Sequence, residues 1–103
     1  MAEESLSWQA ESDTLVLRGE FDRVTLLPLW SARGAALRGI RFLDVSGLDR
    51  VDSAGLATML HLCAQQSAQG GSLTLTGVTH KLLTLITLYH LEDILPFVRA
   101  PSL

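Results

Sequence analysis

The sequence has one cysteine, Cys63, and no long apolar run. A single thiol forms no intramolecular disulfide and no cysteine-based metal site, as is typical of chains in a reducing compartment. No apolar run approaches the roughly 20 residues that span a bilayer. Residues 1–5 (MAEES) are acidic and lack the positively charged and then apolar pattern of a secretory signal. If the protein serves a membrane process, we expect it to do so from the cytoplasm, by docking onto another protein.

Basic residues are also few, because eight Lys and Arg against eleven Asp and Glu give a net charge of −3. They are spread along the chain, whereas nucleic-acid binding usually requires a clustered basic face. There is no glycine-rich phosphate loop, and Ser53 lacks the Gly-x-Ser-x-Gly elbow of serine hydrolases. His61, His80 and His90 are not spaced to act as a base toward Ser53. We expect no nucleic-acid partner, no catalytic residue and no cofactor.

What the sequence has is enough apolar residues, 48% of 103, for one hydrophobic core. We predict a single domain over residues 1–103, with a core at about 5–97 and a frayed tail at 98–103. Alternating and helical apolar patterns predict strands at 6–10, 14–19, 41–45 and 72–76, and helices at 25–37, 53–69 and 79–89. This β-β-α-β-α-β-α order predicts an α/β fold: a mixed sheet of about four strands with three to four helices.

The most informative segment joins the strand FLDVS at residues 42–46 to the helix that begins with VDSAGL at 51–56. Between them we expect a short polar loop. Asp52 and Ser53 are both good N-cap residues, since their side-chain oxygens can accept hydrogen bonds from the first helical turn. A phosphate on a hydroxyl at this position would also be tolerated electrostatically. Capping and a regulatory role therefore both remain open for Ser53.

These two runs, with LRGEFD at residues 17–22, resemble the STAS domain, the family of sulfate-transporter and anti-sigma-factor-antagonist domains. The resemblance covers almost the whole chain. Within the family, LSW at 6–8, LLPLW at 26–30, LTLTGV at 73–78 and LYHL at 88–91 are similar to small cytoplasmic subunits of bacterial ABC transporters that move phospholipids between the two membranes. The resemblance implies a non-catalytic subunit that binds the transporter's ATPase subunit and supports lipid asymmetry of the outer membrane.

One position departs from the phosphorylated members of the family. Regulated anti-sigma antagonists carry their phosphoacceptor hydroxyl immediately before the glycine of this turn, and here that residue is Ala54. Ser53 keeps a hydroxyl one residue earlier, so phosphorylation at Ser53 remains an open alternative. The resemblance predicts a partner-binding surface formed by Asp52, Ser53, Ala54, Thr58 and His61.

Two alternatives to the transporter subunit remain open. One is an anti-sigma-factor antagonist in a partner-switching system, which the absent hydroxyl at Ala54 disfavours. The other is a hydrolase or small-ligand binder that uses acidic side chains at the strand ends, although caps and turns explain these acids equally well. The acids are Glu20, Asp22, Asp44, Asp49 and Asp52.

The helix at 79–89 has more aliphatic residues than a one-sided stripe needs. Either Leu85 or Leu88 is exposed for a partner, or the whole helix is buried on its own sheet.

Overall fold

The chain begins with the hairpin that its alternating pattern predicts. In the computed structural model, which describes residues 5–100, β1 (Leu6–Glu11) pairs with β2 (Thr14–Phe21) in antiparallel register. A two-residue turn joins the strands and places Ser12 at a φ of 59°. Positive φ is typical of the tight turns whose twist matches that of a hairpin.

The rest of the chain alternates helices and strands, and the three predicted helices are confirmed with ends that differ by at most one residue. The elements after the hairpin are α1 (Leu26–Ala36), β3 (Phe42–Val51), α2 (Ser53–Ala68), β4 (Thr74–Val78), α3 (His80–Leu88) and β5 (Phe97–Arg99).

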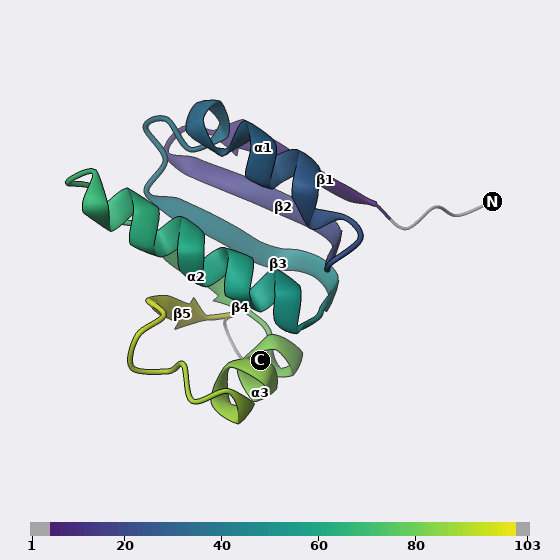
Figure 1. Cartoon of the computed structure of the whole chain (residues 1–103). Coiled ribbons are helices and arrows are strands. Elements are labelled where there is room, and N and C mark those ends of the chain that lie inside the picture. The colour runs from purple at the N-terminus through teal and green to yellow at the C-terminus, as the bar shows by residue number, and fades with distance from the viewer. Residues whose placement is uncertain (1–4, 101–103) are drawn as a thin grey trace.

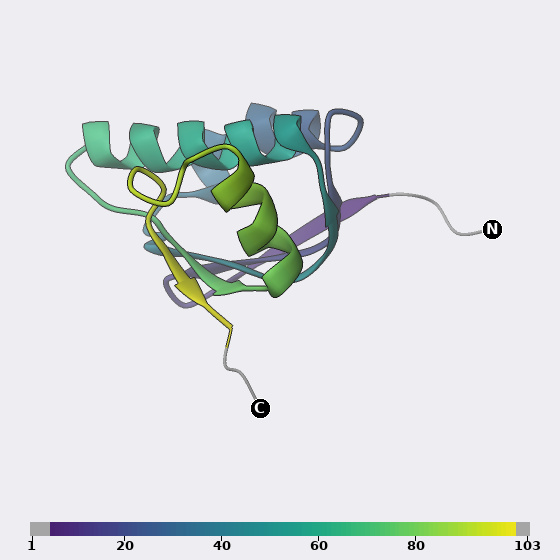
Figure 2. The same cartoon turned by 90° about the horizontal axis from the view of Figure 1, so that it is seen from below.

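The five strands form one sheet in the order β1-β2-β3-β4-β5. β1 is antiparallel to β2, and every later neighbour pairs in parallel, so the predicted mixed sheet is confirmed. Helices α1 and α2 lie side by side on one face of the sheet, and α3 lies at the end of the sheet that carries β4 and β5 (Figures 1 and 2). Because β2, β3 and β4 run in the same direction, α1 and α2 also run in the same direction and begin at the same edge.

The core fills the space between the sheet and these two helices. Alternate residues of the central strands are fully buried, including Leu15, Leu17 and Leu43, and they pack in one cluster with Leu29 of α1 and Met59 of α2. Burial of each such side chain contributes roughly 1.5–3 kcal/mol. No helix of residues 5–100 covers the opposite face of the sheet (Figure 2).

The predicted end of β3 was wrong. We expected a strand at 41–45 followed by a polar loop, but β3 continues to Val51. Its second half pairs with the extended end of β2, across register shifts on both sides of Arg18 and Gly19. Leu48 in this half is 9% exposed and joins the core. Hydrogen bonding to β2 and the burial of Leu48 therefore extend the strand, although the composition of this segment is polar.

The sheet also has a strand that the sequence did not predict. Residues 97–99, most of which we expected to fray, form β5. The N–H of Leu75 donates to the carbonyl of Pro96 at 2.9 Å, and the N–H of Ala100 donates to the carbonyl of Val78 at 2.9 Å. Three residues after a proline are too few for a periodic signal. The rest of the expected tail, 101–103, and the acidic residues 1–4 lie outside the described residues.

Candidate functional site

Asp52 organises the start of α2. It is the N-cap residue, and its Oδ1 accepts a hydrogen bond of 2.8 Å from the N–H of Gly55, which confirms the predicted cap. Its Oδ2 accepts a hydrogen bond of 3.1 Å from the N–H of Arg23, in the loop before α1. Ser53 is the first helical residue and is exposed. Its hydroxyl makes no hydrogen bond within residues 5–100, so the expectation that Ser53 also caps the helix was wrong.

Gly55 lets the first turn of α2 press against the end of β2. A Cβ on this residue would collide with the carbonyl oxygen of Phe21, which is itself fully buried. The obstructing atoms belong to backbone, so they cannot swing aside as a side chain would. The glycine of the DSAG run is therefore required by packing.

The loop before α1 is held by its own side chains. Oδ1 of Asp22 accepts hydrogen bonds from the N–H groups of Val24 at 2.9 Å and Thr25 at 3.0 Å, while the hydroxyl of Thr25 accepts one from the N–H of Asp22 at 3.0 Å. Burial by itself raises the pKa of Asp22, but these hydrogen bonds and the positive charge of Arg50 outweigh it and hold the pKa below its usual value. The loop is therefore rigid where it meets Asp52.

The exposed face of α2 differs from the predicted site at one residue. Ser53, Ala57 and His61 are exposed at four-residue spacing, and Ala54 beside them is half-buried. Thr58, which we placed on this surface, is 8% exposed, and its hydroxyl donates to the carbonyl of Ala54 at 2.8 Å. Thr58 therefore satisfies its hydroxyl inside its own helix and does not belong to the exposed face.

Aromatic and cationic side chains join α1 to this face of α2. The rings of Trp30 and His61 meet edge-on, with centroids 6.2 Å apart. The guanidinium of Arg33 lies 3.9 Å from the centre of the Trp30 ring, and its Nε donates to Oε1 of Gln65 at 2.9 Å. This stack fixes the register of the two helices.

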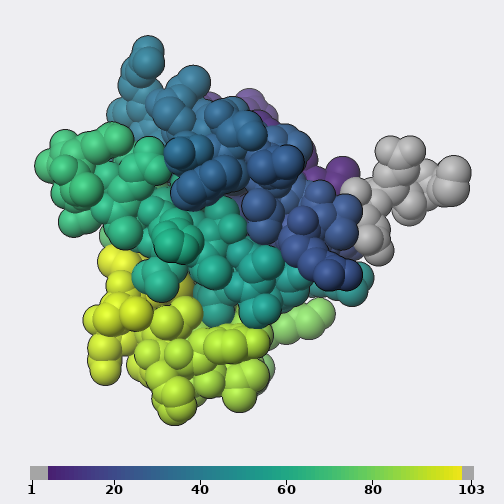
Figure 3. All heavy atoms as spheres, viewed as in Figure 1, coloured from purple at the N-terminus to yellow at the C-terminus, as the bar shows by residue number. Residues whose placement is uncertain are grey.

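The same register brings two exposed apolar residues of the α1 region to α2. Leu27 lies one turn before Trp30, which contacts His61, and Val24 follows Arg23, whose N–H bonds to Asp52. Both residues therefore belong to segments that are joined to the first half of α2. Val24 and Leu27 are 73% and 61% exposed. Figure 3 shows the α1 and α2 regions as one continuous surface. We call it the helix-start surface, formed by Val24, Leu27, Ser53, Ala54, Ala57 and His61.

Sequence reasoning missed Val24 and Leu27. Leu27 is one of several leucines at near-helical spacing in α1, and only the exposed fraction distinguishes it from the buried Leu29. The sequence did carry one signal: an apolar residue near the start of the helix, outside the apolar stripe that packs on the sheet.

The acidic side chains do not form a site together. Both oxygens of Asp52 and one of Asp22 accept backbone hydrogen bonds, while Oδ1 of Asp44 accepts from the N–H and hydroxyl of Ser46 at 3.0 and 2.7 Å. Among residues 5–100, no group of three His, Cys, Asp or Glu side chains is placed to hold a metal ion. Asp22, Asp44 and Asp52 therefore act as cap and turn residues, whereas Oε1 of Glu20 is buried and has no hydrogen-bond partner within residues 5–100.

The third helix exposes one of the two predicted leucines. Leu88 is 67% exposed, which confirms that part of the prediction, whereas Leu85 is half-buried and packs on the core. Leu88 and Leu85 line a small groove of about 210 Å³ between α3 and the end of β3. Across the described residues, no helix combines the length and the hydropathy needed to cross a bilayer.

Comparison with known proteins matches this architecture. The family model described as "Mlab, STAS domain" matches residues 4–97. The intermembrane phospholipid transport system binding protein MlaB of Escherichia coli is 50% identical over 90% of this chain and 97% of its own length. The protein of the same name from Haemophilus influenzae is 33% identical over 85% of this chain and 93% of its own.

A solved structure agrees with the fold. The Bacillus cell-fate determinant SpoIIAA, in its phosphorylated form, superposes with a TM-score of 0.63 at 16% identity and covers 90% of each chain. With nearly its whole length matched in both sequence and fold, the chain belongs to the MlaB group of the STAS domain family.

Proposed function

We propose that this chain is a non-catalytic STAS subunit that binds the ATPase of an ABC transporter and supports its activity. The transporter moves phospholipids and maintains the lipid asymmetry of the outer membrane. The proposal is supported by the relatives named MlaB, each described as a binding protein of an intermembrane phospholipid transport system. In this arrangement the protein lies on the cytoplasmic side and reaches the inner membrane through the transporter complex.

The helix-start surface is the observation that carries the proposal. Val24 and Leu27 are two of the most exposed large apolar side chains of the described residues, and both lie at one end of the helical layer. Exposed apolar residues that gather around small residues are typical of a protein–protein contact. The small side chains of Ser53, Ala54 and Ala57 allow a partner backbone to approach closely.

The rigidity of this surface supports docking without rearrangement. Asp52 joins its two halves, the Trp30–His61 contact fixes the helix register, and Gly55 seats α2 on the sheet. A preorganised surface loses little conformational entropy when a partner binds. Its six residues are neither acidic nor permanently charged, and Asp52 and Arg23, which carry opposite charges, lie between its two halves. The contact is therefore expected to be mainly apolar.

The anti-sigma antagonist is the second candidate, and one observation favours it. The Ser53 hydroxyl is exposed and unbonded within the described residues, so it is open to modification. A phosphate there would place about −1.5 to −2 charges beside Asp52, in the middle of the helix-start surface. In the transporter proposal the same modification would release the ATPase.

The test is a pull-down of the tagged protein from detergent-solubilised native membranes, with mass spectrometry of the co-purified proteins and of the Ser53 peptide. Co-purification of an ABC ATPase with its permease is the expected result. Ala57→Arg should abolish it, because a long cation would enter the contact, whereas Ala35→Arg on an exposed position of α1 should not. Recovery of a soluble kinase or sigma-factor regulator, without the transporter, would overturn the proposal in favour of the antagonist.

A further inference from the structure

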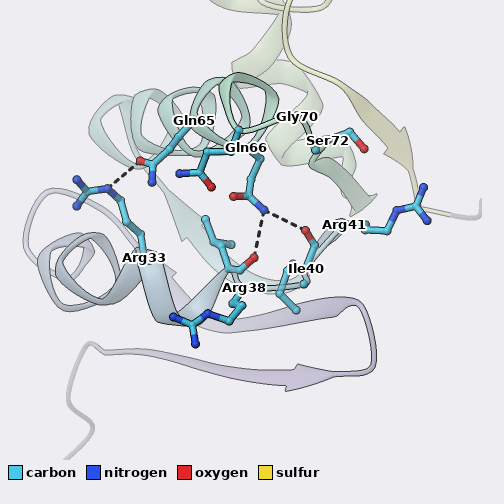
Figure 4. A pocket seen from close by; sticks show the side chains of 13 residues that line it. Arg33, Arg38, Ile40, Arg41, Gln65, Gln66, Gly70 and Ser72 are labelled. Carbon is cyan, nitrogen blue, oxygen red and sulfur yellow. Dashed lines mark hydrogen bonds between the residues drawn. The ribbon is translucent and has the colours of Figure 1, made fainter.

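A cleft of about 790 Å³ lies at the other end of the helical layer from the helix-start surface. It is bounded by the C-terminal ends of α1 and α2 and by the starts of β3 and of the segment that leads to β4 (Figure 4). Three of the eight basic residues of the chain line it, and none of its lining residues is acidic. We call it the arginine cleft, lined by the side chains of Arg33, Arg38, Arg41, Gln65, Gln66 and Gln69.

The three arginine side chains differ in how they are held. Arg33 is fixed, since its Nη1 donates to the carbonyl of Trp30 at 2.7 Å, in addition to its bond with Gln65 and its stacking on the indole ring. Arg38 and Arg41 are exposed, and within residues 5–100 neither side chain has a hydrogen bond or an ion pair. The negative end of the α1 dipole accounts for Arg33 in its last turn and favours Arg38, which directly follows the C-cap residue Leu37. Arg41 lies further along the chain, so the dipole does not account for it.

The remaining lining consists of amides and exposed backbone. Nε2 of Gln66 donates to the carbonyls of Leu37 and Ile40, both at 3.1 Å, which closes the floor of the cleft. Gln69 is exposed and precedes Gly70 and Gly71, whose backbone has no side chain over it. Within residues 5–100, Gln69 keeps both its amide donor and its amide acceptor, Gln65 keeps its donor and Gln66 its acceptor. Together these groups complement a peptide backbone.

The cation spacing selects the kind of ligand. Figure 4 shows Arg33 and Arg41 on opposite sides of the cleft, with the side chains of Arg38 and Arg41 directed outward from its rim, so the guanidinium groups do not converge on one point. A single phosphate would be bound by converging donors, whereas an extended chain with several negative charges meets cations placed along its length. Guanidinium groups bind carboxylates in a bidentate manner.

We propose that the arginine cleft binds an acidic segment of a partner protein, in an extended conformation. Carboxylates of the segment pair with Arg38 and Arg41, and its backbone bonds to the glutamine amides. This site is independent of the helix-start surface. The domain therefore holds two polypeptide segments, one at each end of its helical layer, and only the contact at the arginine cleft weakens strongly with salt.

The test is fluorescence anisotropy with a fluorescein-labelled hexaglutamate peptide and the full chain at low salt. Binding should weaken about tenfold or more in the double variant Arg38→Gln, Arg41→Gln. The matched control is Arg18→Gln, Arg99→Gln, which removes the same charge from exposed positions on β2 and β5. It should bind within about twofold of the natural chain, since steering by net charge alone is small at this distance. Shifts of the Gly39, Gly70 and Gly71 amide resonances should accompany binding.

Three results would overturn the proposal. The first is equal weakening of peptide binding in the two double variants, because the loss would then follow from the change in net charge alone. The second is peptide binding that leaves the three glycine resonances unmoved. The third is displacement of the peptide by inorganic phosphate, or by vesicles of phosphatidylglycerol, when their total negative charge is lower than that of the peptide. That result would identify the cleft as a phosphate-binding site. Thermal melts of both double variants verify that each is folded.

Discussion

The N–H of Arg23 donates a hydrogen bond of 3.1 Å to Oδ2 of Asp52, so the loop before α1 is joined to the first turn of α2. The other oxygen of the same carboxylate accepts from Gly55 at 2.8 Å. One side chain thus caps a helix and fixes the two halves of the helix-start surface relative to each other. Stability and the proposed partner binding are therefore expected to be linked at Asp52.

Replacing Asp52 with Ala should lower the free energy of unfolding by about 1–2 kcal/mol, because the cap and the loop contact are lost together. Asp52→Asn keeps one oxygen and should cost roughly half as much. Urea denaturation measures both values. An Asp52→Ala variant as stable as the natural chain would contradict the structural role of this carboxylate.

Gly55→Ala should be among the most damaging small substitutions in the chain. The new methyl group would collide with the Phe21 carbonyl, and displacing backbone costs about 3 kcal/mol, the upper end for overpacking. Gly34→Ala is the matched control: it lies inside α1, and its added Cβ would meet nothing within 4 Å. That variant should be more stable by about 0.5–1 kcal/mol. Thermal melts of the pair, with opposite shifts expected, decide the point.

Cys63 should destabilise the fold at high pH. Burial raises the pKa of its thiol from 9.0 to about 11, so the folded state favours the protonated form. This stabilising contribution is fully present below pH 9 and is lost as the pH rises toward 11, with about 1 kcal/mol lost by pH 10. Denaturation at pH 8 and pH 10 should show a steeper loss for the natural chain than for Cys63→Ala. An equal slope in the two proteins would contradict the effect.

The helices were predictable because each carries its own local signals. Asp52 and Thr79 cap α2 and α3 as ordinary N-cap residues do, and apolar residues recur at helical spacing after each. The extension of β3 to Val51 and the existence of β5 depend on pairing with β2 and β4, which are distant in sequence. Pairing of this kind leaves no periodic signal in segments that contain Ser, Gly or Pro.

The site was predictable only in part, for a related reason. Helical spacing places Ser53, Ala57 and His61 on one face, but whether that face is buried depends on where α1 lies. Thr58 is polar and yet buried, because its hydroxyl bonds to a carbonyl one turn earlier. The arginines of the cleft are far apart in sequence from its glutamines, so the fold alone brings them together.

Substitutions at Ser53 should change the proposed partner binding without changing the stability of the fold. Ser53→Ala should change the free energy of unfolding by less than about 0.5 kcal/mol, since the hydroxyl caps nothing, and should keep the ATPase bound. Ser53→Glu should leave the fold as stable or slightly more so, because an acid in the first helical turn interacts favourably with the dipole. The same charge should release the ATPase, since binding would desolvate it beside Asp52. Melts and pull-downs of both variants measure this; loss of binding in Ser53→Ala would instead assign the hydroxyl a direct contact or a modification.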